Sequence, residues 1–76
     1  MAIAGSMTTA YRYAPHRDHG QRLVTCERTT WPTAQCQPVD AAVKALAAGE
    51  TVIVRGSDAA AMREAIRRAE WEVRAI

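Results

Sequence analysis

The sequence lacks long apolar runs, and this absence limits what the chain can be. No stretch of its 76 residues approaches the roughly 18 consecutive apolar residues of a membrane helix. The opening "MAIAGSM" has no charged n-region and no cleavage pattern, which argues against a signal peptide. We therefore expect a cytoplasmic protein that makes no membrane contact and keeps its cysteines reduced.

The motifs of common catalytic and cofactor sites are missing as well. The chain has only four glycines, no glycine-rich phosphate loop, no Ser-His-Asp order and no paired-carboxylate arrangement. A domain of this length also leaves little room for a substrate pocket, which occupies on the order of several hundred Å³. We expect neither an enzyme nor a cofactor.

A large excess of positive or negative charge is also absent. Ten basic residues face eight acidic ones, and the formal charge of +2 is too small to require a polyanionic partner. Residues 37–76 balance six bases with six acids, so the excess lies in residues 1–36. Any positive surface should therefore lie in the N-terminal half.

What the chain does contain is alternation in its first half. Residues 1–6 resemble a disordered expression-tag remnant, and residues 7–76 a single small domain. Residues 8–14 alternate as a half-exposed strand does, with Pro15 expected to end it. A polar turn, "HRDHG", precedes a second strand-like run, "QRLVTCERT", so the two runs predict an antiparallel hairpin. We expect a loop in "TWPTAQCQ", which follows.

The second half changes to helical periodicity. The spacing predicts a helix over 38–48, with Gly49 as the left-handed residue after it. The β-branched run "VIV" predicts a strand buried at the centre of the sheet. Ser57 or Asp58 should cap a second helix, and "WEVRAI" should form an edge strand. The prediction is an α+β two-layer sandwich in the order β-β-α-β-α-β, a four-stranded mixed sheet with two helices on one face.

Both histidines and both cysteines lie between residues 16 and 36. His16, His19, Cys26 and Cys36 carry donor types that zinc prefers, but no two cysteines lie two to four residues apart. A Cys26–Cys36 disulfide would close a short loop, yet no export signal supports it. We expect solvated histidines, compact apolar thiols and no metal.

The position of Cys36 just before the first helix suits an activated thiol. The segment "CQPV…LAAGETVIVRGSD" resembles the small sulfur-carrier proteins, in which a Cys-Pro-x-Pro motif opens the first helix and a Gly-Glu pair leads into the next strand. The resemblance covers residues 36–76 and implies a sulfur-acceptor role for Cys36. Gln37 stands where that motif has its first proline.

The helix-free face of such a sheet should be open for binding. Aromatic residues and arginines are enriched at interface hot spots, so we expect binding by Tyr11, Arg12, Tyr13, Arg22, Arg28 and Trp31. The chain would then be a small non-enzymatic binding protein: an adaptor, a complex subunit or a compact inhibitor of the phage or mobile-element type. Its partner would be another protein or a second copy of itself. The alternative is a single-stranded nucleic-acid-binding module that stacks bases on Tyr11 and Tyr13 beside Arg12.

Overall fold

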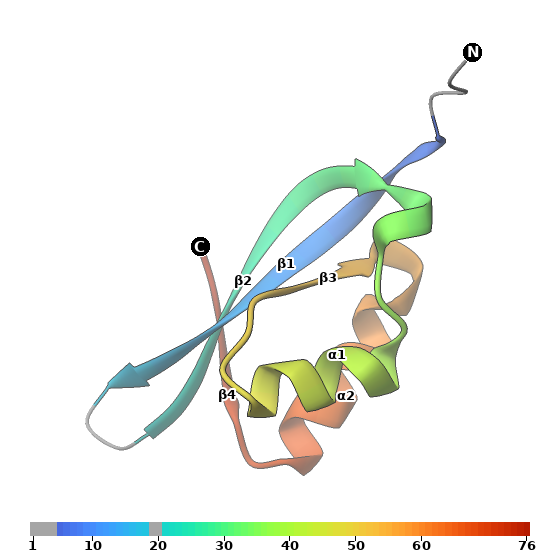
Figure 1. The fold of residues 1–76 in the computed structure, drawn as a ribbon. Helices are drawn as coiled ribbons and strands as arrows, with labels where there is room; N and C mark the ends of the chain where they lie inside the picture. Colours follow the sequence, from blue (N-terminus) through green and yellow to red (C-terminus); the bar gives the residue numbers. More distant parts are fainter. Residues whose placement is uncertain (1–4, 19–20) are drawn as a thin grey trace.

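Four strands and two helices form the two layers of this protein. The computed structural model describes residues 5–18 and 21–76. Figure 1 shows a mixed sheet with both helices on one face, which confirms the predicted α+β class and element order. The elements are β1 (Met7–Asp18), β2 (Gln21–Pro32), a 3₁₀ turn (Thr33–Gln35), α1 (Val39–Ala47), β3 (Val52–Arg55), a second 3₁₀ turn (Gly56–Asp58), α2 (Ala59–Arg68) and β4 (Glu72–Ala75).

The hairpin, not the "VIV" strand, occupies the centre of the sheet. The strand order is β3-β1-β2-β4, with β1 antiparallel to both of its neighbours and β2 parallel to β4. The expected central position of β3 is therefore wrong. β1 and β2 are 12 residues each, whereas β3 and β4 have four. The long strands pair along their whole length, and each short strand covers part of one outer edge.

β1 does not end at Pro15, contrary to expectation. The backbone N–H of Ile76 donates to the Cys26 carbonyl at 3.0 Å on the β4 side, so Cys26 turns its backbone groups away from its β1 partner, Tyr13. The backbone groups of Tyr13 therefore point away from β2, and those of Pro15, two residues further along β1, point in the same direction. Its nitrogen faces the edge of β1 past the end of β3, and no ladder bond to β2 is lost.

The expected loops are shorter than the sequence suggested. The strand β1 continues through His16 to Asp18, and residues 19 and 20 of the predicted "HRDHG" turn lie outside the described residues. At the other end, β2 continues through Pro32 and is followed by the first 3₁₀ turn. Hairpin pairing thus extends the strands by three residues into each of the two predicted loops.

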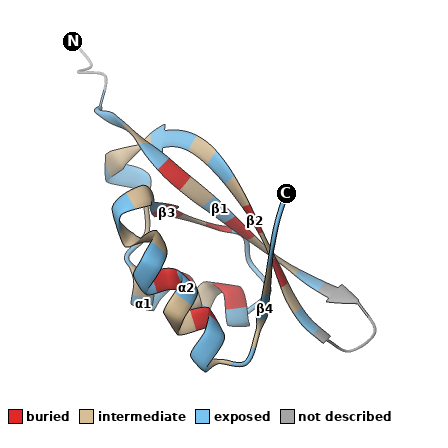
Figure 2. Cartoon of the chain, turned by 180° about the vertical axis from the view of Figure 1, so that it is seen from behind, coloured by how far each residue is buried: buried red, intermediate tan, exposed pale blue. Residues whose placement is uncertain are grey.

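Alternate residues on the strands pack against the helices to form the core. Each helix contributes a buried pair four residues apart, Ala42 with Leu46 and Met62 with Ile66. The buried positions appear along this interface in Figure 2. The sheet side of the core consists of Tyr13, Val24, Cys26, Val52 and Val54. Burying each large apolar side chain contributes about 1.5–3 kcal/mol.

The helix boundaries follow the predicted signals closely. α1 begins after Pro38, and Gly49 follows it with φ of 88°. That left-handed conformation has little steric cost for glycine. Asp58 precedes α2, as expected of one of the two predicted capping residues, although its side chain makes no capping hydrogen bond.

Candidate binding surface

The sheet face turned away from the helices is the candidate surface, which we call the outer face. Strand register assigns its residues, because a side chain shares its face with the partner residues directly opposite. They are Thr8, Ala10, Arg12, Ala14 and His16 on β1, Leu23, Thr25, Glu27, Thr29 and Trp31 on β2, Ile53 and Arg55 on β3, and Glu72 and Arg74 on β4.

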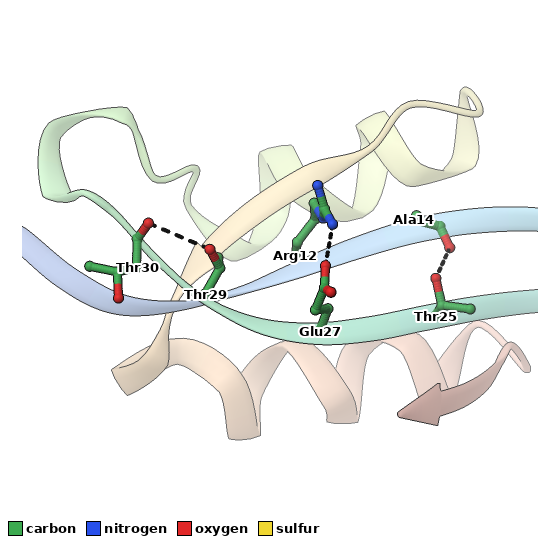
Figure 3. A network of polar contacts seen from close by, with 6 residues as sticks. All are labelled: Arg12, Ala14, Thr25, Glu27, Thr29 and Thr30. Carbon is green, nitrogen blue, oxygen red and sulfur yellow. Dashed lines mark hydrogen bonds and ion pairs between the residues drawn. The ribbon is translucent and has the colours of Figure 1, made fainter. Parts of the chain in front are cut away.

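A row of three side chains crosses the middle of the outer face. Arg12 lies between Ile53 of β3 and Glu27 of β2 in the register. The Arg12 guanidinium forms an ion pair with the Glu27 carboxylate (Figure 3). Since both side chains are well exposed, the pair stabilises the fold by only about 0.2–1 kcal/mol. Its main effect is to orient the arginine beside the half-buried Ile53.

The next row has a different character. Ala10 lies between Arg55 and Thr29 and is 0% exposed. It lies outside the helix-side core cluster, which is consistent with its place on the outer face. Trp31, two residues after Thr29 on the same face of β2, is 36% exposed. The outer face therefore combines a small buried residue, an exposed aromatic and charged groups.

The two tyrosines do not lie on this face, contrary to expectation. Tyr13 is opposite Val52 and Cys26 and is 1% exposed in the core. Burial raises the pKa of the Tyr13 hydroxyl well above its ordinary value, and the neighbouring Cys26 raises it further. Tyr11 lies on the same side and packs partly buried against the core. Arg12 points the other way, so the predicted base-stacking group of Tyr11, Arg12 and Tyr13 is not assembled.

The predicted arginines are also divided between the two faces. Arg22 and Arg28 share the helix side of β2 with Val24 and Cys26, by alternation along the strand. The Arg22 guanidinium carbon lies 6.0 Å from the ring centroid of Trp71, at the limit of a cation–π contact. Of the six predicted binding residues, the structure places only Arg12 and Trp31 on the outer face.

The cysteines are free thiols in separate environments. Cys26 is buried in the core at 7% exposure, and Cys36 is half-buried, with its sulfur 3.6 Å from the Pro32 carbonyl oxygen. His16 is exposed, while His19 lies outside the described residues. Within residues 5–18 and 21–76, no three His, Cys, Asp or Glu side chains gather as metal ligands would. Nor does any helix in that part of the chain have the length and apolarity to cross a membrane.

Among the outer-face residues that the sequence did not reveal are Ile53 and Arg55 of β3. The sequence pattern assigned Ile53 to the core, because a run of three β-branched residues looks the same whether one face or both are covered. The only available signal is the short length of β3, which suits an edge strand. Comparisons of this chain with protein-family models, curated proteins and solved structures find no match.

Proposed function

We propose that this chain is a small, non-enzymatic protein-binding module of the cytoplasm that docks on a protein partner through the outer face. The observation that carries the proposal is the one-sided helix layer. Both helices pack on the side of Tyr13 and Val54, and they leave the side of Arg12 and Ile53 uncovered among the described residues. An adaptor, a complex subunit and a compact inhibitor all act by docking in this way.

The composition of the outer face supports a protein as the partner. Arginine and tryptophan are enriched among residues that dominate binding energy, and Arg12 and Trp31 are both exposed there. Ile53 adds apolar area in the row of Arg12. Because these side chains stand on paired strands, little backbone conformational freedom is lost on binding, which favours affinity.

The charges of this face define the partner further. Arg12 pairs with Glu27, and Arg74 lies 3.5 Å from Glu72. Arg55 has no ion-pair partner in the described part of the chain. Among the described side chains of this face, Arg55 beside Ile53 therefore carries an uncompensated positive charge, and a carboxylate near an apolar side chain is the partner chemistry that fits it.

Placing two negative charges on the outer face of β3 tests the proposal. The double variant Ile53→Glu with Arg55→Glu should lose a protein captured from cells of the source organism, because it puts two carboxylates where apolar and cationic groups stood. Lys44→Glu is the matched control, since it reverses a charge on the exposed side of α1. Circular dichroism confirms that each variant remains folded.

Quantitative mass spectrometry of the captured proteins gives the readout. We expect at least one protein to be retained equally by the original chain and by Lys44→Glu, and to fall at least about tenfold with the double variant, as loss of hot-spot contacts does. Equal retention of every captured protein by all three folded forms would refute docking through the outer face.

A further inference from the structure

The outer edge of β2 continues beyond the strand that covers it. β4 pairs with Leu23–Cys26, and the chain reaches Ile76, whose N–H donates to the Cys26 carbonyl at 3.0 Å. β2 itself continues for six residues to Pro32. Within the described residues, no strand pairs with Glu27–Pro32 on that side. An unpaired edge of this kind is a template for another strand.

The hydrogen bonds of the sheet show which backbone groups face this edge. The Cys26 carbonyl faces β4, and the groups of a strand alternate in direction, so those of Arg28, Thr30 and Pro32 face outward too. Thr33 confirms this alternation, because its N–H points toward the β1 side and donates to the Ser6 carbonyl at 2.8 Å. Arg28 and Thr30 thus each present a donor and an acceptor, whereas Pro32 presents only an acceptor.

We propose that a second copy of this chain pairs with this edge, β2 against β2, antiparallel and centred on Thr30. In that register the two Thr30 residues exchange two hydrogen bonds across the two-fold axis. The N–H of Arg28 donates to the Pro32 carbonyl of the second copy, and the reverse occurs at the other end. Because Pro32 has no N–H, it cannot donate the return bond to the Arg28 carbonyl, so this pair of residues forms one hydrogen bond in place of two.

Steric and charge limits disfavour the two registers whose centres lie closer to Ile76. Continuing the β4 register places Ile76 beside Glu27. Pairing centred on Thr29 would put Trp31 of the second copy at that occupied position. Pairing centred on Arg28 would set two arginine side chains directly opposite each other, which is unfavourable. Centring on Thr30 ends the added strand at Pro32, opposite Arg28, so that only Thr33 of the second copy, where the chain turns out of the strand, lies beside Ile76.

The side chains also match in the proposed register. Trp31 on the outer face meets Thr29 of the second copy, and an aromatic beside a β-branched residue is a favourable cross-strand pair. The Thr29 hydroxyl lies 3.5 Å from the Thr30 carbonyl oxygen (Figure 3), which keeps a second lone pair for the intermolecular bond. Arg28 meets Pro32, so no like charges face each other. The dimer has one eight-stranded sheet and does not depend on the function proposed for the outer face.

A disulfide trap tests the register directly. Residues that exchange hydrogen bonds across antiparallel strands have Cα atoms about 5.5 Å apart, within disulfide reach. In a Cys36→Ser background, Thr30→Cys should therefore form covalent dimers under mild oxidation. Ala47→Cys, on the exposed side of α1, is the control and should stay at least about tenfold less crosslinked. Equal crosslinking of the two variants would overturn the proposal.

Amide hydrogen exchange of the unsubstituted chain supplies a second measurement, which does not depend on whether a variant folds. Raising the concentration from about 0.01 to 1 mM, the range of weak association, should slow exchange at Thr30 at least about tenfold. The Thr29 amide faces β1 and should not change. Sedimentation should show dimers over the same range, with Thr30→Val retaining them and folded Thr30→Pro losing them. A monomer at all concentrations with unchanged Thr30 exchange would refute the pairing.

Discussion

Replacing Tyr13 with alanine tests which side of the hairpin meets the helices. Tyr13 is 1% exposed and lies among the core residues of both layers. Truncation of a buried aromatic side chain to alanine costs about 3–5 kcal/mol. The neighbouring Arg12→Ala is the matched control, because it removes only an exposed ion pair on the outer face, which costs about 0.2–1 kcal/mol.

The magnitude is large for a chain of this size. Proteins are stable by about 0.05–0.15 kcal/mol per residue, which for 76 residues gives roughly 4–11 kcal/mol. Tyr13→Ala should therefore remove between about a quarter and all of the folding free energy. Urea unfolding followed by tryptophan fluorescence and by circular dichroism measures this loss as a lower midpoint. Similar midpoints for Tyr13→Ala and Arg12→Ala would refute the packing described for β1.

The hydroxyl of the same residue predicts a pH dependence. Burial and the neighbouring Cys26 raise the folded-state pKa of Tyr13 above the unfolded value of 10.0. The stability that the neutral hydroxyl contributes is fully present below pH 10 and falls as the pH rises from there toward the folded pKa, by at most about 1.4 kcal/mol per pH unit. Tyr13→Phe, which cannot ionise, should show a shallower loss above pH 10. Identical alkaline profiles would contradict this origin.

Three further predictions concern the surface and the turns. A double-mutant cycle on Arg12→Ala and Glu27→Ala should give a coupling of about 0.2–1 kcal/mol by urea unfolding, and this coupling should shrink in high salt; a salt-independent value would exclude an ion pair. Arg22→Ala should lower stability by about 0.5–1 kcal/mol through lost cation–π contact and should alter the fluorescence of Trp71; no change in either would show that the contact is not formed in solution. Gly49→Ala should destabilise by about 1–2 kcal/mol, because alanine disfavours φ of 88°, and an unchanged melting temperature would contradict that conformation.

The sequence predicted the elements and their order because helical and strand periods differ. The positions after α1 and before α2 carry residue types that end or begin helices, Gly49 and Asp58, so both helices could be located. Strand alternation defined two faces of β1 but did not show which one is inside. A tyrosine can be buried with its hydroxyl beside a thiol, as Tyr13 is beside Cys26, or it can stay exposed at an interface.

Strand length and position depended on pairing, which a single segment does not encode. Pro15 is compatible with β1 only because its nitrogen faces an uncovered edge, and this requires knowledge of where β3 ends. Likewise, Ile53 lies on the outer face because the β1–β3 register places it opposite Arg12, and the sequence of β3 alone does not contain that register. The helix-free sheet face was therefore predicted correctly, whereas Tyr11 and Tyr13 were assigned to the wrong side of the sheet.

The position of the hairpin has a consequence for the order of folding. β3 and β4 each have a single neighbour, which is a hairpin strand in both cases. Neither can add to the sheet before that strand is in place, so we expect the hairpin to belong to the folding nucleus. Substitutions at Thr25, within β2, should mainly slow folding, whereas those at Val73, within β4, should mainly speed unfolding. Chevron kinetics with the opposite pattern would mean that docking of the C-terminal strand precedes closure of the hairpin.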